Sequence, residues 1–144
     1  MKHKAACLLL SLLAVPAATL SAFGNLSADE VRTLFSGQTV EGEFRGGTEK
    51  YLEPGGVDVF AEPFVMYFSG EGAVRSLRGG KKRKGTWRVD GKGNLCVQWK
   101  GKKEGCAPVT REGSVYKKYM RRGGGRIKWV RTFNKFTPGN TGNL

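Results

Sequence analysis

Apolar and polar residues alternate along the stretch GTWRVDGKGNLCVQWKGKKEGC, which runs from Gly85 to Cys106. Two short alternating segments are separated by DGKGN, whose Gly, Asp and Asn residues are typical of turns. A period of two with Gly-rich interruptions predicts antiparallel strands covered on one face. The predicted covered face carries Trp87, Val89, Leu95, Val97 and Trp99.

Two cysteines fit this hairpin. In an antiparallel pair the residue numbers of facing residues add up to the same value along the pair. Cys96 and Cys106 therefore face each other if the turn is centred on Gly101. Directly opposed residues lie within the range that a disulfide requires, so we predict a Cys96–Cys106 bridge. The alternative is two free thiols. The spacing is too wide for a CxxC redox motif. We also expect no metal site, because the one histidine, His3, lies in the segment that we predict to be cleaved as a signal peptide.

The first residues have the pattern of a secretory signal. Lys2 and Lys4 precede an apolar run at 5–15, which is too short to span a bilayer, and small residues follow. We predict a signal peptide at 1–22, cleaved after Ser21 or Ala22, with an uncleaved anchor as the alternative. A signal and a disulfide both indicate a periplasmic or secreted protein, with no transmembrane segment after cleavage.

The remaining chain of about 120 residues is long enough for one domain, which we place at 23–137, with a flexible tail at 138–144. Ser27 and Glu30 form a capping-box pattern before a short helix at 28–36, and Gly37 suits its end. The basic run Lys81–Lys84 is expected on a loop. Strands are predicted at 38–44, 49–56, 57–60, 64–68, 73–77, 85–89, 95–99, 106–109, 114–122 and 126–134, the second and third weakly.

Two of these strands have informative faces. In 114–122 the alternation is poor, because Lys118 shares a face with Tyr116 and Met120. In 126–134 one face carries Ile127, Trp129, Arg131 and Phe133.

Short strands at roughly ten-residue spacing leave no room for crossover helices. We therefore predict an all-β fold, a small antiparallel up-and-down barrel of about eight strands with one N-terminal helix, because closure removes exposed edges. A two-sheet sandwich is the alternative.

Several motifs resemble known groups. Arg131 on the last strand and Gly85-Thr-Trp87 resemble features of lipocalin-like (calycin-type) barrels. The segments 39–42 (TVEG), 85–89 (GTWRV) and 95–99 (LCVQW) with Cys106 are similar to a group of short secreted bacterial proteins of unknown function. The resemblance implies secretion and a barrel fold.

Charge is unevenly distributed. Residues 22–74 have a net charge of −6, whereas residues 75–135 have 20 basic and 3 acidic residues, a net charge of +17. Such a surface attracts polyanions in a salt-dependent way. The alternative is a solvated surface that only improves solubility.

The composition argues against an enzyme. Without histidine or free thiol in the mature chain, and without a nucleophile elbow or phosphate loop, we predict no catalytic residues and no cofactor. The first hypothesis is a barrel that holds a small hydrophobic or amphipathic ligand, lined by Phe64, Phe68, Trp87, Trp99, Trp129 and Arg131. The second is an interaction protein that docks on an anionic envelope component or a partner protein through Lys81, Lys82, Arg83, Lys84, Lys102, Lys103, Arg121 and Arg122. We do not expect a nucleic-acid partner, given the secreted location.

Overall fold

The computed structural model describes residues 23–46 and 61–144. The predicted signal peptide and the weak strand predictions at 49–56 and 57–60 lie outside these residues. In chain order the elements are β1 (Phe23–Asn25), α1 (Ala28–Phe35), β2 (Gln38–Gly46), β3 (Ala61–Phe68), β4 (Ala73–Arg78), β5 (Lys81–Val89), β6 (Leu95–Trp99), β7 (Gly105–Ala107), β8 (Val109–Glu112), β9 (Val115–Arg121), the 3-10 turn η2 (Gly123–Gly125) and β10 (Ile127–Pro138).

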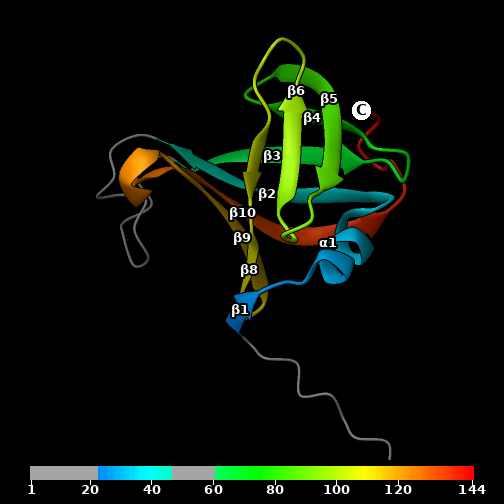
Figure 1. Cartoon of the computed structure of the whole chain (residues 1–144). Coiled ribbons are helices and arrows are strands. Elements are labelled where there is room, and N and C mark those ends of the chain that lie inside the picture. The colour runs from blue at the N-terminus through cyan, green and yellow to red at the C-terminus, as the bar shows by residue number, and fades with distance from the viewer. Residues whose placement is uncertain (1–22, 47–60) are drawn as a thin grey trace, which may run out of the picture.

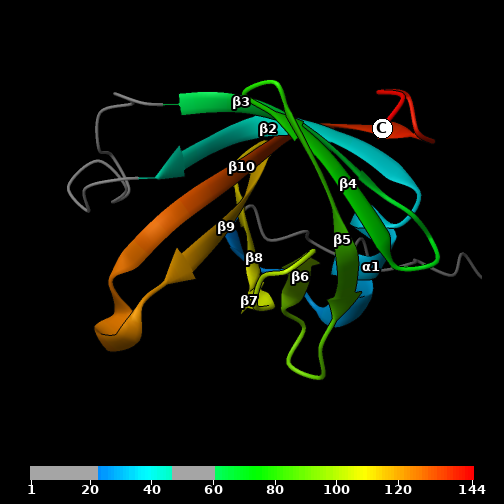
Figure 2. The ribbon, with the colours of Figure 1, turned by 90° about the horizontal axis from the view of Figure 1, so that it is seen from above.

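All ten strands form one antiparallel sheet in the order β1-β8-β9-β10-β2-β3-β4-β5-β6-β7. The sheet curls into a half-barrel around a common interior, with α1 on one side and the β9–β10 hairpin extending to the other (Figures 1 and 2). The predicted all-β class is confirmed. The strand count differs because the chain after the Cys hairpin divides at Pro108 into β7 and β8, and because β1 adds to β8.

Helix α1 begins at Ala28 as predicted and ends at Phe35, one residue before the predicted end. The Ser27 hydroxyl accepts a hydrogen bond from the Glu30 amide (3.2 Å), and the Glu30 carboxylate accepts one from the Ser27 amide (2.7 Å). Gly37 follows the helix with a φ of +71°, a conformation that glycine adopts without strain. One short amphipathic helix is stabilised mainly by the face that it buries.

That face closes one end of the interior. Phe35 is fully buried, and its ring meets those of Phe68, Phe133 and Phe136 edge-on, at centroid distances of 4.9, 5.0 and 5.4 Å. Trp87 packs on Phe68 at 5.5 Å. Edge-to-face aromatic pairs add to the free energy gained by burying apolar area. The α1 end of the half-barrel is therefore a packed core.

The Cys hairpin has the predicted register. Cys96 faces Cys106 directly, the flanking pairs share the same index sum, and the two cysteines form a disulfide with a Cα–Cα distance of 4.0 Å. Leu95 and Val97 point into the core, at 0% and 5% exposure. The bridge therefore fastens β7, the last strand of the sheet, to β6.

The basic run Lys81–Lys84 lies on a strand, so the prediction of a loop is wrong. These residues form the first half of β5 and pair with β4, while β6 pairs only with Gly85–Val89. The first half of β5 is thus an edge, and all four side chains are exposed. Charged side chains suit a strand edge, because they keep other chains from pairing there.

Strand β10 departs from the predicted alternation. Its pairing with β9 shifts register between Ile127 and Trp129, and Ile127 packs with Val130 and Tyr119 in a small separate cluster. Ile127 and Trp129 therefore do not share a face, contrary to the prediction, because a bulge reverses the side-chain alternation.

The residues predicted to form a flexible tail are hydrogen-bonded to the sheet. The Thr39 hydroxyl donates to the Gly139 carbonyl (2.6 Å) and accepts from the Thr141 amide (3.0 Å). Arg75 Nη1 donates to the Leu144 carbonyl (3.0 Å). The end of the chain is thus tied to β2 and β4.

Candidate functional site

A cavity of about 320 Å³ lies at the end of the half-barrel away from α1, and we call it the basic cavity. Its volume falls at the lower end of the ~300–1,000 Å³ that small-molecule sites occupy. Residues from β2, β4, β5, β6, the β6–β7 turn, β7, β9 and β10 line it, so the curl of the sheet creates it. The lining residues are Phe44, Arg78, Arg83, Val97, Trp99, Lys103, Glu104, Gly105, Lys118, Met120, Arg121, Lys128, Trp129 and Arg131.

Lys118 is the deepest cation of this site. Only 1% of the residue is exposed, and its Nζ donates a hydrogen bond to the Gly105 carbonyl (3.1 Å). The bond joins β9 to β7, two strands that do not pair with each other. Burial, and next the charge of Arg131, lower the pKa of Lys118 to about 7, opposed by the carboxylate of Glu104. Loss of hydration weighs most because the ammonium has few partners.

Arg131 is the second buried cation, at 6% exposure. Its guanidinium carbon lies 5.0 Å from the ring centroid of Trp129 and 5.6–5.7 Å from those of Phe44, Phe64 and Trp99. Its Nε is buried and has no hydrogen-bond partner among the described residues. Burial, and next the charges of Arg78 and Arg83, lower the pKa of Arg131 to about 9, which leaves the guanidinium charged at neutral pH. Aromatic faces, which attract cations, supply its main stabilisation.

The carboxylates near the cavity are engaged by other residues. Glu104 accepts two hydrogen bonds from Arg88, at 2.6 and 2.9 Å, and Glu62 pairs with Arg78 at 3.2 Å. The Arg88 hydrogen bonds lower the pKa of Glu104. Arg78 also stacks on Phe44, with its guanidinium carbon 3.8 Å from the ring centroid. Neither carboxylate pairs with Lys118 or Arg131 in the part of the chain that the structure describes.

The predicted ligand-binding residues divide between the two ends of the half-barrel. Trp99, Trp129 and Arg131 meet in the basic cavity, and Phe64 packs against the Arg131 guanidinium. Phe68 and Trp87 instead pack in the core beneath α1, where the Trp87 Nε1 donates to the Ser69 carbonyl (2.8 Å). These two are placed as structural core residues.

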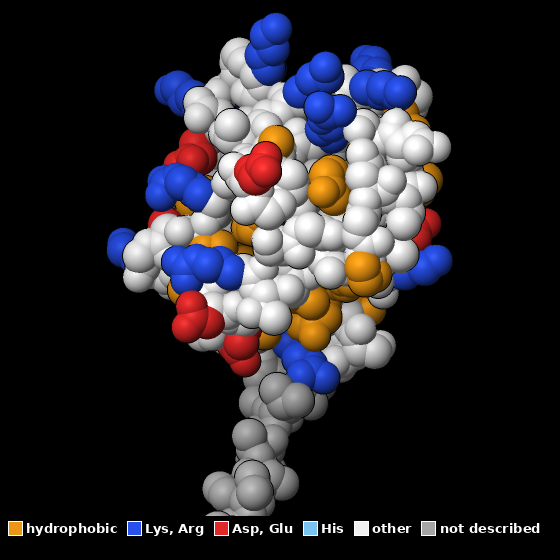
Figure 3. Space-filling model, turned by 90° about the vertical axis from the view of Figure 1, so that its right-hand side faces the viewer, with side chains coloured by type: hydrophobic (Ala, Val, Ile, Leu, Met, Phe, Trp, Pro, Cys, Tyr) orange, Lys and Arg blue, Asp and Glu red, His pale blue; other side chains and the backbone are white. Residues whose placement is uncertain are grey.

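Three of the eight predicted anion-binding residues, Arg83, Lys103 and Arg121, line the same cavity. The other five lie near them in the sequence, and all eight are exposed. Figure 3, which views the molecule from the right-hand side of Figure 1, shows Lys and Arg side chains gathered at its upper end. The five predicted anion-binding residues that do not line the cavity are Lys81, Lys82, Lys84, Lys102 and Arg122.

Sequence reasoning did not assign Lys118 to a site, nor Phe44, Arg78 and Lys128. The signal for Lys118 was present, since a lysine on the apolar face between Tyr116 and Met120 has to be either snorkelling or buried. Phe44 and Arg78 gave no such signal, because they approach the site only through the curl of β2, β3 and β4.

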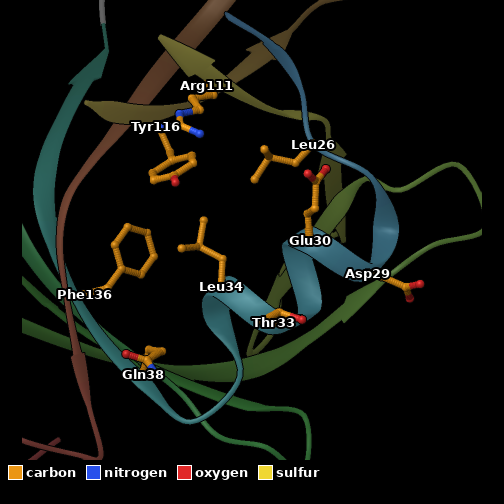
Figure 4. A pocket seen from close by; sticks show the side chains of 9 residues that line it. All are labelled: Leu26, Asp29, Glu30, Thr33, Leu34, Gln38, Arg111, Tyr116 and Phe136. Atoms are coloured by element: carbon orange, nitrogen blue, oxygen red, sulfur yellow. The ribbon is translucent and has the colours of Figure 1, made fainter. Parts of the chain in front are cut away.

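A second, shallower pocket of about 550 Å³ lies beside α1. In Figure 4 the side chains of Leu26, Leu34, Tyr116 and Phe136 point toward its centre. Its charged groups have local partners, such as Glu30 in the capping box, and none of its described charges is buried. This pocket lacks the unpaired buried charge that distinguishes the basic cavity.

Within residues 23–46 and 61–144, no helix has the length and apolarity needed to cross a bilayer. Comparison of the chain with protein-family models, with curated proteins and with solved structures gave no match in any of the three. The geometry of the site is therefore the guide to function.

Proposed function

We propose that the protein is a secreted or periplasmic, non-enzymatic binding protein that holds one small amphipathic ligand in the basic cavity. The observation that carries the proposal is the combination of aromatic walls, Trp99 and Trp129, with two buried cations, Lys118 and Arg131, that lack carboxylate partners among the described residues. Apolar walls with a few convergent polar groups are typical of small-molecule sites.

The chemistry of the lining supports binding rather than catalysis. The described residues that line the cavity include no serine, threonine, cysteine or histidine, and Glu104, the one carboxylate among them, is bound by Arg88. A hydroxyl or thiol nucleophile paired with a base is therefore not formed by these residues. The cations and aromatic rings can hold and orient a ligand.

Native mass spectrometry of the protein purified without denaturation tests the proposal. We expect one extra mass per chain that disappears on unfolding, or else a saturable change in tryptophan fluorescence at one equivalent of an added amphipathic probe. A bare mass, with no saturable fluorescence change for probes of positive, negative or zero charge, would contradict it.

A second candidate function rests on the exposed edge of β5. All four residues of the run Lys81–Lys84 are exposed, and one of them, Arg83, also lines the basic cavity. An anionic envelope polymer could dock along this edge. Binding of such a polymer should weaken steeply with salt, because it releases counterions. Replacing all four by glutamine should remove most of that binding, and salt-insensitive binding would count against this function.

A further inference from the structure

The basic cavity has far more positive than negative charge. Among the described residues, seven cationic side chains line it and one carboxylate, Glu104, which Arg88 already neutralises. Of the seven, Arg78 has its own partner in Glu62. The remaining six are Arg83, Lys103, Lys118, Arg121, Lys128 and Arg131.

Two of these cations, Lys118 and Arg131, are buried without an anionic partner among the described residues. Burying an ammonium or guanidinium costs free energy unless anions or several acceptors replace its water. Lys118 has one carbonyl acceptor at 3.1 Å, and the buried Arg131 Nε has none among the described residues. Apolar side chains of similar length would fill the same space without this cost. The arrangement therefore favours an anionic group bound at Lys118 and Arg131.

The walls of the cavity indicate the rest of the ligand. The rings of Trp99, Trp129 and Phe44 surround the Arg131 guanidinium, and Val97 and Met120 add apolar surface. Flat apolar groups stack well on tryptophan rings. A cavity of about 320 Å³ admits a molecule of one or two fused rings with one anionic substituent.

We propose that the ligand is a soluble phosphate monoester with a flat apolar group, whose phosphate binds Lys118 and Arg131 and whose flat part lies against Trp99 and Trp129. This inference rests on the proposed function of the basic cavity. A phosphate monoester carries a charge of about −1.5 to −2 at neutral pH and offers three strong acceptor oxygens. It matches several unpaired cations better than a carboxylate, which carries one charge.

Calorimetric titration with ring-matched probes tests the inference. The probes are 1-naphthyl phosphate, 1-naphthoate and 1-naphthol, with inorganic phosphate as the probe without a ring. We expect 1-naphthyl phosphate to bind one per chain, at least tenfold more tightly than each of the other three. Charge-assisted hydrogen bonds and ring stacking each account for a factor of this size.

Replacing Lys118 by methionine removes the charge and shortens the unbranched side chain by one atom. Lys118→Met should weaken 1-naphthyl phosphate about tenfold or more and change 1-naphthol less than threefold. Lys92→Met is the matched control, because Lys92 is exposed on the β5–β6 turn, where the neighbouring Gly93 lies against α1. This control should leave the affinity of every probe unchanged.

The outcomes separate the two proposals. Tighter binding of 1-naphthol, or equal binding of 1-naphthoate, would overturn the phosphate assignment and leave a ligand-binding cavity. Inorganic phosphate binding as tightly as the ester would overturn the role of the flat group. Binding only to vesicles of phosphatidylcholine containing phosphatidate would overturn the soluble source. No binding of any of the four probes would overturn the phosphate assignment, and together with a bare native mass and no fluorescence change for probes of any charge it would overturn the proposed function as well. An unchanged affinity in Lys118→Met would remove Lys118 from the site.

Discussion

Replacing Lys118 by methionine should make the protein more stable at neutral pH, although it deletes a hydrogen bond. The folded protein buries this ammonium, and the pKa of Lys118 falls from 10.5 to about 7, chiefly because burial removes its water. The charged groups that face it are Arg131, which lowers the pKa further, and Glu104, which raises it. A buried cation of this kind destabilises the fold wherever the unfolded chain would carry the proton.

The magnitude follows from linkage. Each pKa unit between the folded and unfolded states corresponds to ~1.4 kcal/mol, so the full cost of burying the Lys118 charge is about 5 kcal/mol. Below pH 7 both states are protonated and the whole cost is present. As pH rises from 7 toward 10.5, the folded state has released a proton that the unfolded state still binds, and the free energy of unfolding rises. Between pH 7 and pH 9 the gain from this residue is about 2 kcal/mol.

Urea unfolding followed by tryptophan fluorescence measures this gain. At pH 7, Lys118→Met should raise the free energy of unfolding by roughly 3–4 kcal/mol, since most of the burial cost is present at this pH and loss of the hydrogen bond to the Gly105 carbonyl offsets about 1 kcal/mol. The difference between the variant and the wild type should shrink by about 2 kcal/mol from pH 7 to pH 9. Lys92→Met should show neither effect. A destabilised Lys118→Met with an unchanged pH profile would refute the reasoning and make Lys118 a structural residue.

Three further predictions concern the fold. Gly42→Ala should cost about 2–4 kcal/mol in urea unfolding, because the new Cβ would collide with the Thr132 carbonyl of β10; Gly91→Ala, which meets nothing within 4 Å, is the control, and equal losses would contradict the close approach of β2 to β10. Replacing both cysteines of the Cys96–Cys106 bridge by alanine should lower the free energy of unfolding by about 3 kcal/mol for a loop of this length. If reductant also destabilises this variant, which has no bridge, the effect of reductant cannot be ascribed to the bridge. Phe35→Ala should cost ~3–5 kcal/mol by thermal or urea unfolding, and a loss below ~1 kcal/mol would show that α1 does not close the core.

Local patterns predicted the features that depend on neighbours in sequence. The capping box of α1 and the Cys96–Cys106 register both follow from short spacings, since each involves at most eleven residues of chain. The all-β class followed for the same reason, because alternation and turn residues are local signals.

The remaining features depend on parts of the chain that are distant in sequence. The bulge after Ile127 reverses one face of β10, and no local pattern marked it. The basic cavity requires β2, β5 and β9 to meet, which only the curl of the complete sheet determines. Lys118 was visible in the sequence as a break in alternation, but its burial and lack of a carboxylate partner among the described residues emerge only from packing.

The most direct test of a ligand site in the basic cavity uses the three indole N–H signals of the ¹⁵N-labelled protein. Trp99 and Trp129 line the basic cavity, while Trp87 lies in the core with its N–H bonded to the Ser69 carbonyl. On titration with 1-naphthyl phosphate, the signals of Trp99 and Trp129 should shift together and saturate at one equivalent, and that of Trp87 should stay in place. A shift of Trp87 alone, or no shift of Trp99 and Trp129 at saturating probe, would contradict a binding site in the basic cavity.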